Sequence, residues 1–114
     1  MDYTDRLRSL GLNDARFAEG SLQPVDADPL VLDPKTLELV RLAALVAVGG
    51  AVPSYGAQAD SAVNAGATAA EIVDVLVGVI PVVGLPCVVA AAPKLALALG
   101  FDLDDVAWER QPTE

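Results

Sequence analysis

The stretch that decides the fold is LDPKTLELVRLAALVAVGG, residues 32–50. Asp33 followed by Pro34 marks the start of a helix, because the carboxylate can accept a hydrogen bond from the first turn and the fixed φ of proline suits that turn. Gly49 and Gly50 predict where the helix ends. From Leu42 onward this helix is apolar on every side, which is typical of a helix at the centre of a bundle.

The rest of the chain also predicts helices joined by short connections. A capping box of Thr68 and Glu71 opens one of them, and Gly66 and Gly100 are stop signals for two others. No segment shows the period-two alternation of a strand, so the fold class is all-α. We expect helices over residues 2–10, 13–19, about 34–48, about 55–65, 69–80 and from the PVVGLP turn (81–86) to 99.

The chain divides by composition into an arm, a core and a tail. We predict an N-terminal helical arm and connector over residues 1–30, a single helical core domain over 31–101 and a C-terminal tail over 102–114. Trp108 in the tail is expected to pack on a neighbouring subunit or within its own chain.

Composition excludes several classes of function. The net charge of -9 and the lack of a basic cluster argue against nucleic acid as a partner, since a phosphate backbone would be repelled. One cysteine and no histidine rule out an internal disulfide and a thiolate metal site, and remove the commonest general base, so we predict no metal. The polar, acidic N-terminus does not resemble a secretory signal, and we expect a cytoplasmic protein.

The chain is also unusually apolar for its size. Apolar residues make up 54% of its 114 residues. This is more than a small monomer usually covers, so we expect a homo-oligomer. Two charge-free runs, residues 42–59 and 75–93, are long enough to span a membrane. Pro81, Pro86 and Pro93 interrupt the second run, and neither run has basic flanks or an aromatic belt. Buried helices are therefore favoured over a membrane protein.

Three short motifs resemble a known family. LDPKTLEL (32–39), NAGATAAEI (64–72) and GLP (84–86), in this order, resemble the carboxymuconolactone decarboxylase family, which includes the alkyl hydroperoxidase D-like proteins. The resemblance covers about residues 30 to 100. It implies a helical bundle that assembles as a trimer or hexamer.

The redox branch of that family carries a Cys-x-x-Cys-x-x-x-His site, which this chain lacks. Counting back from Gly66, those positions fall on Ala51, Ser54 and Gln58, although the interval from Glu38 is one residue longer than the family pattern. The register around Gly50 to Ser54 thus stays open, but no cysteine or histidine is available in either register. We predict that the protein is not a peroxidase, because that reaction needs an attacking and a resolving thiol.

The decarboxylase branch also lacks the cysteine pair. The resemblance implies that this branch acts on unsaturated lactone acids with neither metal nor organic cofactor. We therefore predict a lyase or isomerase acting on a small (cyclic) carbonyl or lactone acid, with no cofactor. The alternative from a different class is a non-catalytic oligomer of the same fold that binds a small ligand or serves as a scaffold.

Five residues are candidates for the site. Glu38, Tyr55 and Gln58 are the candidate catalytic residues, because a carboxyl, a phenol and an amide can move a proton or stabilise an enolate oxygen. Arg41 and Ser54 are the candidate substrate-binding residues, since a guanidinium pairs with a carboxylate and a hydroxyl donates to a carbonyl.

Each candidate also has a purely structural interpretation, and both stay open. Ser54 can cap a helix after Pro53, Gln58 can bond between helices, and Tyr55 can satisfy a buried carbonyl. Glu38 and Arg41 can form an ion pair on the surface of one helix. Cys87, which lies among apolar residues, is expected to be a structural residue.

Overall fold

The structure is a computed structural model, and it describes residues 2–12 and 30–101. The chain separates into two units, Met1–Val31 and Leu32–Glu114. The described part of the first unit holds one short helix, α1 (Tyr3–Gly11). The predicted helix over residues 13–19 and Trp108 lie outside the described residues.

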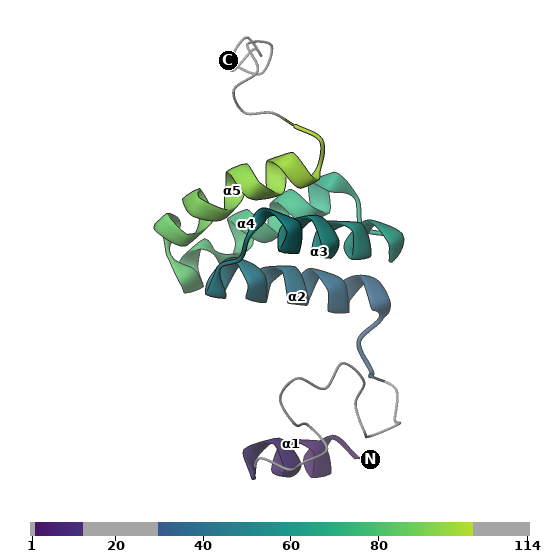
Figure 1. Cartoon of the computed structure of the whole chain (residues 1–114). Coiled ribbons are helices and arrows are strands. Elements are labelled where there is room, and N and C mark those ends of the chain that lie inside the picture. Colours follow the sequence, from purple (N-terminus) through teal and green to yellow (C-terminus); the bar gives the residue numbers. More distant parts are fainter. Residues whose placement is uncertain (1, 13–29, 102–114) are drawn as a thin grey trace. The chain divides into compact units, whose positions relative to one another are not determined.

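The second unit contains four helices within its described part (Figure 1), and each contacts the other three. They are α2 (Pro34–Val48), α3 (Val52–Asn64), α4 (Ala69–Val83) and α5 (Leu85–Ala98). The described residues contain no strand, which confirms the all-α prediction.

The ends of these helices follow the predicted caps in most cases. The Asp33 carboxylate accepts a hydrogen bond of 2.8 Å from the Thr36 amide. Helix α2 ends where Gly49 has a φ of 85°, a value that glycine adopts without strain. Thr68 and Glu71 form the predicted capping box at the start of α4. The sequence therefore sets these boundaries through local hydrogen bonds.

Two predicted boundaries are wrong. Helix α3 begins at Val52, three residues before the prediction, so Ala51 is its N-cap and Ser54 lies inside its first turn. Pro53 explains the early start, because a proline in the first turn has no amide that would need a partner there. The cap interpretation of Ser54 is thereby corrected.

The PVVGLP segment is not an open turn. Helix α4 continues through Pro81 to Val83, and Gly84, with a φ of 88°, alone separates it from α5. A proline inside a helix removes one hydrogen bond, but it does so here in the last turn of α4, where few residues follow. The turn therefore consists of Gly84 alone, which adopts a positive φ without strain.

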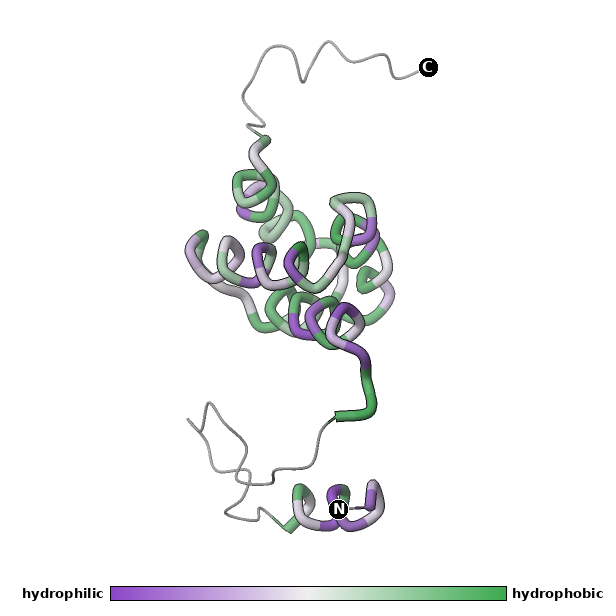
Figure 2. The backbone as a smooth tube through the Cα atoms, turned by 90° about the vertical axis from the view of Figure 1, so that its right-hand side faces the viewer, coloured by the Kyte–Doolittle hydropathy of each residue, from purple (hydrophilic) through white to green (hydrophobic). Residues whose placement is uncertain are grey.

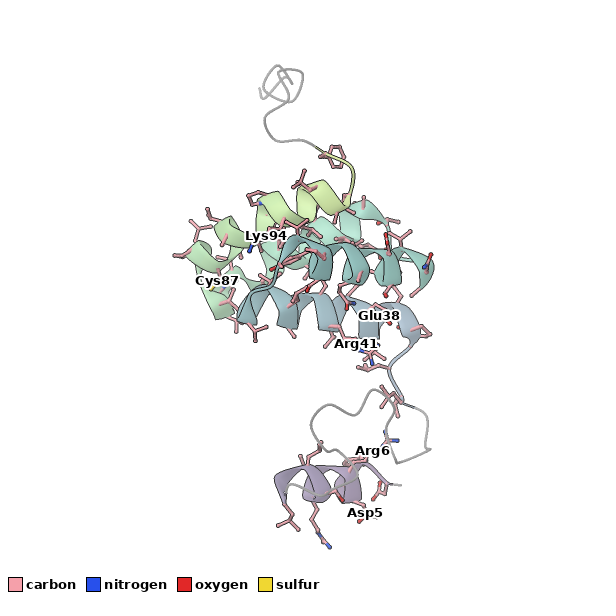
Figure 3. The ribbon with its side chains drawn as sticks, in the orientation of Figure 1. Asp5, Arg6, Glu38, Arg41, Cys87 and Lys94 are labelled. Atoms are coloured by element: carbon pink, nitrogen blue, oxygen red, sulfur yellow. The ribbon has the colours of Figure 1, made fainter. Side chains whose placement is uncertain are left out.

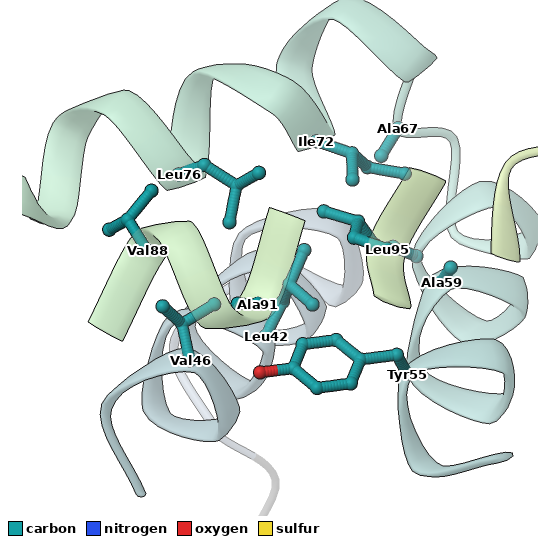
Figure 4. Close-up of a cluster of buried hydrophobic side chains, with 11 residues drawn as sticks. Leu42, Val46, Tyr55, Ala59, Ala67, Ile72, Leu76, Val88, Ala91 and Leu95 are labelled. Carbon is teal, nitrogen blue, oxygen red and sulfur yellow. The ribbon is translucent and has the colours of Figure 1, made fainter. Parts of the chain in front are cut away.

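The core lies between the four helices (Figure 4). Tyr55 is 1% exposed and is the largest side chain that is fully buried. The other buried members are apolar: Leu42, Val46, Ala59, Ala62, Ala67, Ile72, Leu76, Val88, Ala91 and Leu95.

Much apolar surface stays outside this core. Hydrophobic residues extend over most of the four-helix unit (Figure 2), and Val48 and Val82 are 81% and 86% exposed. The predicted central position of the apolar part of α2 is not reached within the single chain, because Leu42 and Val46 are buried while Val48 faces outward. Helix α2 therefore keeps an apolar face outside the core of its own chain.

The long charge-free runs are divided between separate helices. The run 42–59 is interrupted between Val48 and Val52, and the run 75–93 at Gly84. Within residues 2–12 and 30–101, no helix has the length and apolarity needed to cross a membrane.

Candidate functional site

Three of the five candidate residues meet in one hydrogen-bonded group, here called the Glu38 cluster (Glu38, Arg41 and Gln58). The Gln58 amide nitrogen donates to Glu38 Oε1 at 2.9 Å and to the Glu38 backbone carbonyl at 3.1 Å. Arg41 Nη1 donates to Glu38 Oε2 at 3.2 Å. Both carboxylate oxygens thus have a donor, and the cluster ties α3 to the first half of α2.

The side chains of the Glu38 cluster differ in their exposure to solvent. Figure 3 shows Glu38 and Arg41 on α2. The side chain of Glu38 is 19% exposed, whereas that of Arg41 is 53% exposed. The carboxylate is therefore held in place, and the outer part of the guanidinium faces solvent. A planar guanidinium with exposed N–H groups can receive a second carboxylate by paired hydrogen bonds.

Tyr55 lies elsewhere along the same pair of helices. Its hydroxyl donates to the Leu45 carbonyl oxygen over a long 3.4 Å, so its hydrogen bond does not go to the Glu38 cluster. Burial raises the pKa of the Tyr55 phenol, and the nearby Cys87 raises it further. The phenol is consequently neutral at physiological pH.

Ser54 is the fifth candidate. It lies on the exposed first turn of α3, and its backbone amide donates to the Ala51 carbonyl at 3.0 Å. Its role in binding a substrate stays a prediction.

A functional group that the sequence analysis missed is Lys94. Its ammonium donates to the Gly50 carbonyl at 2.8 Å, across a separation of 44 residues. It lines a hollow of about 160 Å³ between the end of α2 and α5, together with Tyr55 and Cys87. We call this the Lys94 hollow. A sequence signal existed, since Cys87, Ala91 and Lys94 are spaced to share one face of a helix.

A second hollow of about 480 Å³ lies between α4 and α5. Asp74 is its one charged lining residue, and its other lining residues are apolar: Ala69, Ala70, Val73, Leu76, Ala92, Leu95, Ala96, Leu99 and Phe101. Neither this hollow nor the Lys94 hollow is lined by a residue of the Glu38 cluster.

Potential metal ligands are dispersed over the structure. Within the described ranges, no three histidine, cysteine, aspartate or glutamate side chains lie close enough to hold a metal ion. The Glu38 cluster supplies one carboxylate, and its two partners are an amide and a cation.

The comparisons with known proteins agree with this helical frame. The model of the carboxymuconolactone decarboxylase family matches residues 10–97. The match begins about twenty residues before the motifs quoted above and spans all of α2, α3 and α4 and nearly all of α5. No curated protein and no solved structure matches the chain significantly. Since the family model covers most of its length, the chain belongs to the carboxymuconolactone decarboxylase family.

Proposed function

We propose that the protein is a cofactor-independent lyase or isomerase that acts on a small carbonyl or lactone acid and has no thiol redox activity. The observation that carries the proposal is the Glu38 cluster, in which a carboxylate is fixed by Gln58 and Arg41 while the guanidinium stays half exposed. The single cysteine and the lack of histidine support the exclusion of peroxide reduction.

The cluster supports a division of roles. Arg41 binds the substrate carboxylate, Gln58 fixes the orientation of Glu38, and Glu38 exchanges the proton. In an isomerisation, Glu38 takes a proton from the carbon next to the carbonyl and returns it to another carbon of the conjugated system, so that no atom is lost. In a decarboxylation, the bond to the carboxylate breaks and carbon dioxide leaves, the electron pair of that bond forms an enolate with the carbonyl, and the enolate carbon takes a proton that Glu38 has accepted from solvent.

A ligand screen followed by an assay tests the proposal. Lactone and keto acids at millimolar concentration should raise the melting temperature, since a ligand at a hundred times its Kd stabilises by about 2.7 kcal/mol. NMR should then detect loss of carbon dioxide or migration of a double bond in the compounds that bind. Arg41→Gln should abolish the stabilisation, whereas Lys35→Met, which removes another cation of α2, should preserve it. An absence of stabilisation by any such acid would refute the enzyme proposal.

A second candidate is a non-catalytic oligomer that binds a small apolar ligand or serves as a scaffold. The hollow of about 480 Å³ between α4 and α5 favours it, because its walls are almost wholly apolar and its size suits a small ligand. The exposed Val48, Val77 and Val82 favour burial against further copies of the chain. Light scattering is the test of assembly, and a mass equal to the single chain of 11.7 kDa would refute the oligomer.

A further inference from the structure

Lys94 differs from the other described cations of the four-helix unit in the partner of its charge, whatever reaction the Glu38 cluster carries out. Among the described residues of the four-helix unit, the other two cations have carboxylate partners: Lys35 bonds Glu71 at 3.0 Å, and Arg41 bonds Glu38 at 3.2 Å. Within the same residues, Lys94 has no carboxylate at ion-pair distance, and its ammonium donates to the Gly50 carbonyl. Lys94 is also partly buried. A cation in such a place is stabilised by an opposite charge, which the described chain does not supply.

The shape around Lys94 is that of a small apolar cup. Its floor is formed by Val46, Tyr55 and Ala91, all of which are buried. Its rim includes the exposed Val48 and Ala90. A ligand can therefore enter from solvent and still reach the core of the bundle.

The polar side-chain groups of the cup are few and carry no negative charge. Besides Lys94, the lining residues with a polar side-chain group are Tyr55 and Cys87. Burial raises the pKa of Tyr55, so that its hydroxyl is neutral at physiological pH. One cation, neutral polar groups and apolar walls together match a molecule with one negative group and a small apolar body.

We propose that the Lys94 hollow binds a small monocarboxylate, with the carboxylate paired to Lys94 and the apolar body against Val46 and the Tyr55 ring. The hollow measures about 160 Å³. Pockets that bind drug-sized ligands begin at roughly 300 Å³, so a short or singly cyclic acid fits this smaller space. The site lies at the end of α2, whereas Glu38 lies near its start.

The competing explanation is that Lys94 only caps the junction of α2 and α3 through the Gly50 carbonyl. The Gly50 carbonyl follows the last turn of α2 and accepts from the Lys94 ammonium at 2.8 Å. A cap alone predicts that loss of Lys94 lowers stability, and it predicts no preference for negatively charged molecules. A charged and an uncharged probe of equal shape therefore separate the two explanations.

The experiment is an NMR titration of the full chain with cyclopentanecarboxylate and with its uncharged analogue cyclopentanecarboxamide. The carboxylate should shift the amide signals of Gly49, Gly50, Cys87 and Ala90, and the amide compound should bind roughly tenfold more weakly or worse, which corresponds to about 1.4 kcal/mol. Equal binding of the two compounds, no binding at millimolar concentration, or shifts confined to Glu38 and Arg41 would overturn the proposal.

Three variants complete the test. Lys94→Met should abolish carboxylate binding, and Ala90→Leu should do so as well by filling the rim while the cation remains. Because Ala90 is exposed, this second variant is expected to fold even where Lys94→Met does not. Lys35→Met is the matched loss of a cation elsewhere and should leave binding unchanged. Retained binding in Ala90→Leu, or an equal loss in Lys35→Met, would also overturn the proposal.

Discussion

The Glu38 cluster lies in the first half of α2, and the Lys94 hollow lies at its end. The two differ in their space for a ligand and in the pairing of their charges. The cluster has its charges paired and lines neither hollow, whereas the Lys94 hollow has space and apolar walls but no carboxylate for its cation among the described residues. In this chain the Glu38 carboxylate and the small cup are therefore separate. Tyr55 and Gln58, only three residues apart in the sequence, thus belong to two places with different chemistry.

The separation follows from the pairing of α2 with α3. Tyr55, early in α3, reaches Leu45 late in α2, and Gln58, later in α3, reaches Glu38 early in α2. This order is that of two antiparallel helices. Residues three positions apart on one face of α3 are thus directed to different parts of α2.

The largest expected effect concerns Tyr55, the shared wall of the core and the Lys94 hollow. Tyr55→Ala should lower the free energy of unfolding by about 3–5 kcal/mol, because it removes a buried aromatic ring and leaves a cavity. Tyr55→Phe should cost about 1 kcal/mol or less, since the hydrogen bond that it deletes is long. Urea unfolding measures both, and an Ala variant as stable as the Phe variant would contradict this packing of the ring.

The next effect concerns Gln58, which joins the Glu38 cluster to α3. Glu38 accepts from Gln58 through both its carboxylate and its carbonyl, and it is partly buried. Gln58→Ala should therefore cost about 1–2 kcal/mol, because both acceptors lose a donor. Ser61 is an exposed position of α3. The same urea measurement on Ser61→Ala should differ from the parent by about 0.5 kcal/mol or less. Equal effects of the two variants would show that the cluster adds nothing to stability.

Local signals explain what could be predicted from the sequence. The start of α2 at Asp33 and Pro34 and the capping box of α4 depend on residues within three positions of each other, so both were predicted correctly. The start of α3 was missed because Pro53 serves equally well inside a first turn and before one. The all-α class depended on many such signals and was less sensitive to any one error.

The site was harder to predict because its contacts span long separations. The sequence predicts Glu38, Arg41 and Gln58 as site residues from the chemistry of their side chains, and the structure brings these three together. Lys94 is not among the predicted site residues, because its helical spacing with Cys87 and Ala91 does not reveal the bond to Gly50, which joins positions 44 residues apart. Space for a ligand is likewise a property of packing, and hydrophobic periodicity does not encode it.

The response to acid should distinguish two lysines, Lys35 and Lys94. The pKa of Glu71 is lowered by the hydrogen bond from the Thr68 backbone and, next, by Lys35. A lowered pKa in the folded state stabilises the fold above the ordinary value of 4.5, and this contribution is lost as the pH falls through the lowered value. We expect this from urea unfolding between about pH 6 and pH 3, the range of carboxyl titration. Acid should lower the free energy of unfolding less in Glu71→Gln and in Lys35→Met than in the parent protein.

Lys94→Met is the control for this measurement. Acid should lower its free energy of unfolding as much as that of the parent protein, because no described carboxylate pairs with Lys94. The same reduction in Lys94→Met would mean that Lys94 has a carboxylate partner after all.

The smallest effect on stability is expected at Arg41, and it is the most informative about function. The Arg41 side chain is 53% exposed. Arg41→Gln should change the free energy of unfolding by about 0.5 kcal/mol or less, since an exposed ion pair contributes little. If both proposals hold, this variant loses the thermal stabilisation by lactone and keto acids but still binds cyclopentanecarboxylate in the Lys94 hollow, and Lys94→Met shows the reverse. Calorimetric titration of the two variants with both kinds of ligand measures this exchange. Loss of both ligands in Arg41→Gln would place them in one site and contradict the separation along α2.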